Sequence, residues 1–234
     1  MSGILYLIPN TLGECELNTV FPTANADIIR RIKHFIVEDI RTTRRFLKKV
    51  DKNIDIDGLN FYELNGHTPK ENISGYLQAL SDENDMGIIS EAGCPAVADP
   101  GADVVAIAQE KGYKVVPLVG PSSILLSIMG SGFNGQSFAF LGYLPIDAAE
   151  RLKAIKKMET RIHNEHQTQI FIETPYRNTK LAEELVQNCQ ASTKLCIAVD
   201  ITTPTELIQT RTIKAWKSNI PQLDKRPCIF LLYK

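Results

Sequence analysis

The stretch GIISEAGCPAVADPG, residues 87–101, decides the fold class. Its opening run, Gly87–Ser90, is short and apolar, as expected of a buried parallel strand. Residues 91–101 are small and turn-forming, and the next residues, to Gly112, place Val104 and Ala108 at helical spacing. A strand, a compact loop and a helix in succession predict an α/β architecture.

The same alternation extends in both directions from this stretch. Towards the N-terminus, ILYLI and residues 35–37 read as strands, and residues 114–118 follow as another. Parallel strands with crossover helices are the simplest arrangement for this pattern. In the second half, strands are predicted at 137–143, 169–173, 195–200 and 228–233, with helices at 122–130, 147–162 and 176–189. Proline and glycine cluster in residues 116–123, which predicts two α/β domains, 1–117 and 118–234.

Composition excludes several classes of protein. The formal net charge is −1, so no global field attracts nucleic acid or a membrane surface. The five cysteines are scattered without a C-x-x-C pair, which argues against a disulfide framework or zinc site and favours a reducing compartment. Residues 1–10 lack a basic signal-peptide region, and no apolar run could span a bilayer, so a cytoplasmic protein is expected. His163 and His166 stand three positions apart in a polar stretch without cysteine, and no metal site is predicted. His67, in a turn, is expected to be exposed.

Residues 130–135, GSGFNG, match the dinucleotide-binding pattern G-x-G-x-x-G. That pattern binds a cofactor only where a strand precedes the glycines and a helix follows them. Here a helical pattern precedes and a strand pattern follows, so these glycines are predicted to end a helix. The fold is therefore not expected to be of the Rossmann type.

The loop 90–101 is the first candidate binding segment, because open α/β sheets bind ligands where parallel strands end. Its charged groups, Glu91 and Asp99, suit a ligand with hydroxyl and amino donors better than a phosphate. An ordinary surface loop is the alternative. A second small-residue turn, residues 119–123, would present amides and two hydroxyls to an anion, or Ser122 would merely cap a helix.

Basic residues are concentrated between positions 30 and 49, which hold eight of the 26 lysines and arginines. On a helix from Thr42, one face is basic and the other apolar. We call the basic face the α-basic stripe; its members are Arg41, Arg44, Arg45, Lys48 and Lys49. Such a stripe suits phosphate contacts, although a solvated helix face or subunit contact is an equal alternative. Directly before it, Glu38 and Asp39 follow a strand, and one of the two carboxylates could receive a proton from a hydroxyl nucleophile.

Six motifs follow one another along the chain: ILYLIPNTLGE, VEDIRTTRRFLKKV, ISEAGCPAVADPG, KVVPLVGPSS, FAFLGYLP and IFIETPYR. In this order they resemble the motifs of the tetrapyrrole methylase superfamily. The likeness covers residue 4 to about Arg177 and weakens beyond it. It is greatest to the branch that methylates a ribose 2′-hydroxyl of small-subunit ribosomal RNA.

The resemblance implies two α/β domains with S-adenosylmethionine bound in the cleft between them, a homodimer, and no metal. Glu38, Asp39 and Arg41 match an acidic-acidic-x-Arg motif that faces the RNA, and we predict them as catalytic residues. The cofactor residues implied by the resemblance are Pro9, Glu91, Ala92, Gly93, Val97, Ala98, Ser122, Ser123, Leu141, Gly142 and Ala198.

Several positions depart from the pattern of that branch. Glu91 stands where aspartate is usual, residues 10–14 read NTLGE against T-P-I-G-N, and Tyr176 replaces a histidine. The later element 199–203 lacks its basic residues. The cofactor motifs are thus kept, while the segments expected to face RNA differ.

The predicted function is S-adenosylmethionine-dependent methyl transfer to ribosomal RNA or the small ribosomal subunit. Carbon methylation of a tetrapyrrole is one alternative, which would gain nothing from the α-basic stripe. A cofactor-binding protein without catalysis is the other.

Overall fold

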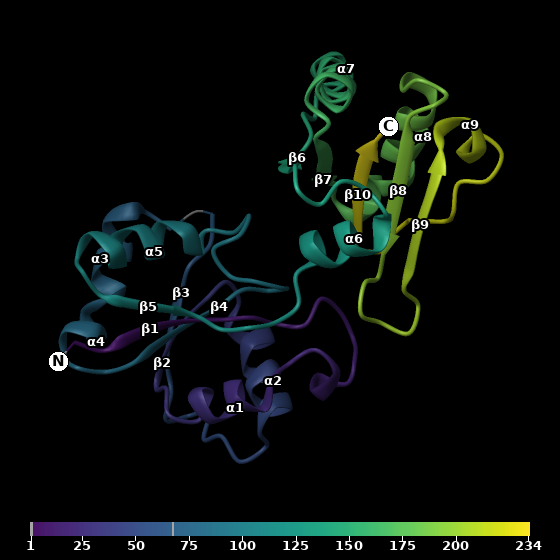
Figure 1. Cartoon of the computed structure of the whole chain (residues 1–234). Helices are drawn as coiled ribbons and strands as arrows, with labels where there is room; N and C mark the ends of the chain where they lie inside the picture. The colour runs from purple at the N-terminus through teal and green to yellow at the C-terminus, as the bar shows by residue number, and fades with distance from the viewer. Residues whose placement is uncertain (1, 67) are drawn as a thin grey trace. The chain divides into compact units, whose positions relative to one another are not determined.

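The computed structural model describes residues 2–66 and 68–234, so His67 lies outside the described residues. The chain divides into two compact units, Met1–Ser122 and Ser123–Lys234 (Figure 1). The predicted division at 117/118 and this division both fall in the segment rich in proline and glycine. The predicted α/β class with two sheets is confirmed.

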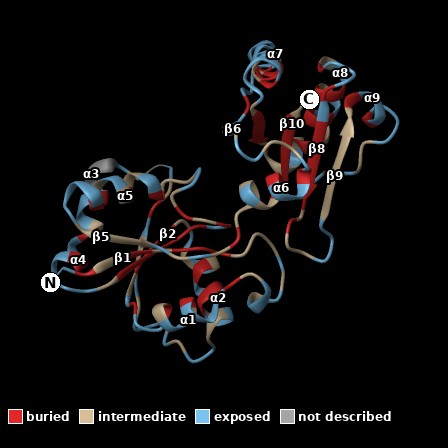
Figure 2. Cartoon of the chain, in the orientation of Figure 1, coloured by how far each residue is buried: buried red, intermediate tan, exposed pale blue. Residues whose placement is uncertain are grey.

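The first unit is built on a parallel sheet in the order β3-β2-β4-β1-β5. One face packs against α1 and α2, and the other against α3, α4 and α5 (Figures 1 and 2). All five strands therefore end at the same edge. The strands are β1 (Ile4–Ile8), β2 (His34–Val37), β3 (Asn60–Glu63), β4 (Met86–Ile89) and β5 (Lys114–Pro117). The helices are α1 (Thr23–Ile29), α2 (Ile40–Val50), α3 (Lys70–Tyr76), α4 (Gln78–Ser81) and α5 (Gly101–Glu110), with a 3-10 turn, η1, at Leu17–Thr19.

The second unit is built on a sheet in the order β6-β7-β10-β8-β9. Only β6 and β7 are parallel, so the expectation of parallel strands is wrong here. A short turn after Val199 joins β8 to β9, and so short a connection permits only antiparallel pairing. The strands are β6 (Phe138–Tyr143), β7 (Thr168–Ile172), β8 (Lys194–Val199), β9 (Leu207–Thr212) and β10 (Cys228–Tyr233). The helices are α6 (Ser123–Ser131), α7 (Ala148–Glu165), η2 (Pro175–Arg177), α8 (Asn178–Asn188) and α9 (Ile213–Trp216).

The G-x-G-x-x-G segment lies where its flanking patterns predict. Helix α6 ends at Ser131, Gly132 adopts a left-handed φ of 74°, and β6 begins at Phe138. The glycines thus follow a helix and precede a strand, which confirms that they are no dinucleotide fingerprint.

Two other observations concern membrane-spanning helices and the reactivity of the cysteines. In the part of the chain that the structure describes, no helix is long and apolar enough to cross a membrane. All five cysteines are free, and burial raises the pKa of Cys189 to about 12 and that of Cys196 to about 11. These thiols are therefore protonated and unreactive at neutral pH.

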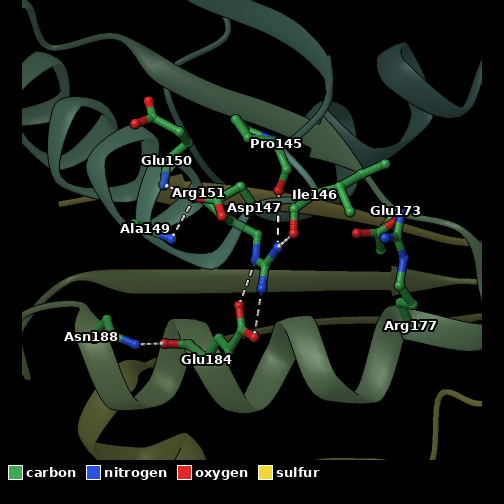
Figure 3. A network of polar contacts seen from close by, with 10 residues as sticks. All are labelled: Pro145, Ile146, Asp147, Ala149, Glu150, Arg151, Glu173, Arg177, Glu184 and Asn188. Carbon is green, nitrogen blue, oxygen red and sulfur yellow. Dashed lines mark hydrogen bonds and ion pairs between the residues drawn. The ribbon is translucent and has the colours of Figure 1, made fainter.

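Arg151 joins α7, α8 and the β6–α7 turn (Figure 3). Its guanidinium contacts both carboxylate oxygens of Glu184, at 2.6 and 2.8 Å, and donates to the carbonyls of Pro145 and Ile146. The Arg151 side chain is 9% exposed. Beside it, Arg177 pairs with the nearly buried Glu173 at 2.7 Å. Planar guanidinium geometry suits this set of acceptors, which a lysine would not satisfy.

Arg151→Met is expected to destabilise the second unit by about 2 to 3 kcal/mol, because it leaves Glu184 and two carbonyls without their partner. Urea unfolding followed by fluorescence measures this, since Trp216 is the only tryptophan and is fully buried in that unit. Lys153→Met is the matched control on the same helix. Its pair with Glu150 is well exposed, so the expected cost is below about 0.5 kcal/mol. Equal stability of the two variants would contradict the structural role of Arg151.

Candidate functional site

The candidate site lies at the carboxyl edge of the first sheet. Pro9, Glu38, Ser90 and Leu118 each directly follow a parallel strand, so their segments meet at one edge. Ligands of open α/β sheets bind at this edge.

The segments after β1 and β4 are joined by backbone and side-chain hydrogen bonds. Asn10 and Gly93 form an isolated antiparallel bridge, with N–O distances of 2.9 and 3.2 Å. The Asn10 side-chain amide also donates to the carbonyls of Ser90 and Glu91, at 3.1 and 3.2 Å. Sequence reasoning missed Asn10, which is buried; its signal was the Pro-Asn pair after a strand, because asparagine side chains often bond backbone groups in turns.

The loop 90–101 has an unusual backbone. Gly93, Ala96 and Ala98 have φ values of 68°, 65° and 61°, in the left-handed region that side-chain-bearing residues seldom adopt. Asp99 stabilises this conformation, because its carboxylate accepts from the amides of Ala96 and Gly101. Burial raises the pKa of Asp99, and the two amides oppose that shift. Asp99, expected from the sequence to contact a ligand, therefore binds its own loop.

This loop exposes a surface of small side chains. Ala92, Val97 and Ala98 are exposed, whereas Gly93 and Pro95 are buried. The turn after β5 packs tightly against the turn after β1, because a Cβ atom added to Gly120 would lie 2.2 Å from Pro9 Cγ. An uncharged surface with accessible backbone suits a nucleoside-type cofactor rather than a phosphate.

Glu38 and Asp39 have different environments. The Oε1 atom of Glu38 accepts from the amide of Glu91 at 3.3 Å, so this carboxylate contacts the loop. Burial raises the pKa of Glu38; the Glu91 amide lowers it, while the carboxylates of Asp99 and Glu91 raise it further. Asp39 caps helix α2: its Oδ1 accepts from the Thr42 amide at 2.8 Å, which lowers the pKa of Asp39.

Thr42 links the two acidic segments. While its amide donates to Asp39, its hydroxyl donates to Oε1 of Glu91 at 2.6 Å. From the sequence, Thr42 was predicted only as the start of a helix, and this contact was missed. The Asp-x-x-Thr spacing signals only the helix cap by Asp39 and carries no information about the contact with Glu91.

The two predicted faces of α2 are confirmed. Thr43, Phe46 and Leu47 are buried, whereas every member of the α-basic stripe is exposed. Arg44 pairs with Asp57 at 2.8 Å, and Lys48 donates to the carbonyls of residues 52 and 54. These two cations therefore hold the loop after α2.

The remaining predicted site residues lie at several places. Arg41 is exposed at the second position of α2, beside Asp39. Ser122 ends the first unit and Ser123 begins α6, while Leu141 and Gly142 lie on β6 and Ala198 is fully buried in β8. Their roles stay predictions. Among the described residues, no group of three or more histidine, cysteine or acidic side chains could hold a metal.

Comparison with curated proteins finds relatives with one name, ribosomal RNA small subunit methyltransferase I. The protein from Vibrio cholerae is 28% identical over 206 residues, covering 88% of this chain and 67% of that protein. Those from Streptococcus pyogenes and Bacillus subtilis are 31% and 29% identical, cover 75% of this chain, and are matched over 57% and 56% of their own length. The chain thus spans about three fifths of the length of these relatives. No family model matches it.

Two solved structures share the fold. The methyltransferase CobJ has a TM-score of 0.67 at 14% identity, with 100% of this chain and 95% of that chain covered. The uroporphyrin-III-C-methyltransferase of Thermus thermophilus has a TM-score of 0.56 at 16% identity, covering 100% and 93%.

The parallel first sheet, the mixed second sheet and these structural neighbours define a tetrapyrrole methylase fold. The six ordered motifs of the sequence are similar to those of that superfamily. By sequence, the chain is also similar to the proteins named ribosomal RNA small subunit methyltransferase I.

Proposed function

We propose that this protein is an S-adenosylmethionine-dependent methyltransferase that modifies a ribose 2′-hydroxyl of small-subunit ribosomal RNA. One observation carries the proposal. A carboxylate of raised pKa, Glu38, is hydrogen-bonded to the small-residue loop and lies directly before a helix with a basic face. The names of the curated relatives support the same substrate class.

The cofactor residues proposed from the first unit lie in the segments that follow the parallel strands, at the carboxyl edge of the sheet. Bound S-adenosylmethionine would supply an electrophilic methyl group. Glu91 and Gly93 would contribute backbone groups, and Ala92, Val97 and Ala98 a surface without bulky side chains. The full proposed set is Pro9, Glu91, Ala92, Gly93, Val97, Ala98 and Ser122, with Ser123, Leu141, Gly142 and Ala198 from the second unit.

Glu38 is the proposed proton acceptor for the ribose hydroxyl, which is a weak nucleophile at neutral pH. Asp39 caps the N-terminus of α2, and we propose that it positions this helix rather than accepting the proton. Arg41, exposed on the first turn of α2, is proposed to contact the RNA backbone.

We also propose that the protein is a cytoplasmic homodimer. Exposed apolar side chains on α6 and β6, such as Met129 at 77% and Tyr143 at 60%, support a subunit interface. Light scattering at several protein concentrations tests this proposal, and a monomer throughout would contradict it.

Transfer of labelled methyl groups tests the function. Purified small ribosomal subunits should acquire label in ribose, whereas a uroporphyrinogen-type tetrapyrrole should not. Mass analysis of ribosomal RNA from cells without this protein should show one ribose methyl group missing. Label on the tetrapyrrole alone would replace the proposal with carbon methylation, and cofactor binding without labelled product would indicate a non-catalytic protein.

A further inference from the structure

A pocket of about 340 Å³ opens in the first unit between the segment after β1, helix α2 and the start of the loop 90–101. Its lining includes Arg45 and Lys49 from α2, and Glu91 and Ala92 from the loop 90–101. This volume lies in the range of small-molecule sites. The complete lining is Asn10, Thr11, Leu12, Gly13, Glu14, Thr42, Arg45, Phe46, Lys49, Glu91 and Ala92.

Some polar side chains of the pocket are hydrogen-bonded within the protein, and one is not. The Asn10 amide binds carbonyls of the loop, and the Thr42 hydroxyl binds Glu91. Lys49 donates to the carbonyl of Cys15 at 2.8 Å and lies 3.9 Å from a Glu14 carboxylate. Arg45 is exposed and has no hydrogen-bond or ion-pair partner among the described residues. The pocket therefore presents one guanidinium whose donors are available to a ligand.

The α-basic stripe is thus divided by function. Arg44 and Lys48 hold the loop after α2, whereas Arg45 and Lys49 line the pocket. A guanidinium recognises an oxyanion through paired donors, a geometry that suits both phosphate and carboxylate. Glu91 also lines the pocket, and its carboxylate accepts from the Thr42 hydroxyl while its amide donates to Glu38, so the pocket adjoins the proposed proton acceptor.

We propose that this pocket binds a backbone phosphate of the single-stranded acceptor RNA next to the methylated ribose, with Arg45 as the phosphate-binding residue. This inference rests on the proposed function, and it places the methyl-accepting RNA strand at the pocket beside α2. The carboxylate of an amino-acid-bearing cofactor is the competing oxyanion. A phosphate is favoured because Arg41 extends the positive charge along the same helix face, as a chain of phosphates requires.

Arg45→Gln and its neighbour Arg44→Gln form a matched pair, one inside the pocket and one outside it. The probe is a single-stranded oligoribonucleotide that spans the ribose found unmethylated in the mass analysis above, measured by fluorescence anisotropy without cofactor at several salt concentrations. Arg45→Gln should weaken binding about 10-fold at low salt. It should also reduce the slope of log K against log salt by about 0.7, the value for one lost phosphate contact on a single strand. Arg44→Gln should change the affinity less than about twofold, since Arg44 lies outside the pocket and its guanidinium is paired with Asp57.

Calorimetry with S-adenosylhomocysteine and steady-state kinetics separate the outcomes. Arg45→Gln should leave cofactor affinity unchanged and raise KM for RNA with little change in kcat. Equal weakening by both variants would overturn the assignment in favour of a diffuse basic field. Loss of cofactor affinity with intact RNA binding would assign the pocket to the cofactor carboxylate. RNA binding that depends on Arg45 without any methyl transfer would keep the subsite and refute the proposed function.

Discussion

Replacing Glu38 with glutamine is expected to slow methyl transfer by about 100- to 10,000-fold, the usual contribution of a positioned general base. Glutamine keeps the size of the side chain, and its amide oxygen can still accept from the amide of Glu91. Cofactor affinity should therefore stay within about twofold of the unmodified protein. Single-turnover transfer of labelled methyl groups, with calorimetry of S-adenosylhomocysteine binding, measures the two quantities separately.

The pH dependence identifies which carboxylate receives the proton. The base must be ionised to act, so the rate should fall as the pH is lowered through its pKa. Because burial raises the pKa of Glu38, this fall should occur above the range of an ordinary glutamate. The pKa of Asp39 is lowered by the Thr42 amide, so a base at Asp39 would lose activity only below the ordinary range of aspartate. In Glu38→Gln, the acidic limb of the residual rate should disappear.

Asp39→Asn is the matched control for the role of Glu38. Asparagine caps a helix about as well as aspartate, so the contact with the Thr42 amide should persist while the charge is removed. We expect less than about a 10-fold reduction in rate. A larger loss in Asp39→Asn than in Glu38→Gln would exchange the two roles and transfer the assignment of the base to Asp39.

The helices and strands that carry the site were predicted best where a sequence pattern is compatible with only one type of secondary structure. β1 matches its predicted range, Ile4–Ile8, because a pentapeptide of apolar residues ending at a proline can hardly be anything but a buried strand. The faces of α2 were predictable because basic and apolar residues alternate with the period of a helix.

The prediction failed where tertiary contacts decide the structure. Helix α1 is seven residues long and begins after a proline, and β3 is four residues long, so neither gives a long periodic signal. The polar strand β9 forms because it pairs with β8 along its whole length. The contacts among Glu38, Thr42 and Glu91 join residues about 50 positions apart, and no local pattern encodes them.

Gly93→Val is expected to reduce cofactor affinity more than about 100-fold, and methyl transfer with it. A branched side chain costs about 1 to 2 kcal/mol in the left-handed region alone. At Gly93, whose φ is 68°, an added Cβ would also lie 3.1 Å from Leu12 Cδ2, in the segment that the Asn10 bridge holds against this loop. The Leu12 side chain can shift, but the strain of the left-handed backbone can be released only by moving the loop backbone that we propose to contact the cofactor.

Gly112→Val separates backbone strain from site geometry. Gly112 has a similar φ of 73°, lies just after α5, and has open space where a Cβ would be added. Both variants should lose a comparable amount of thermal stability, because the intrinsic backbone penalty is the same. Only Gly93→Val should lose S-adenosylhomocysteine binding in calorimetry. If Gly93→Val bound this ligand as tightly as Gly112→Val does, the loop after β4 would lie outside the cofactor site, and Glu38 would have no methyl donor beside it.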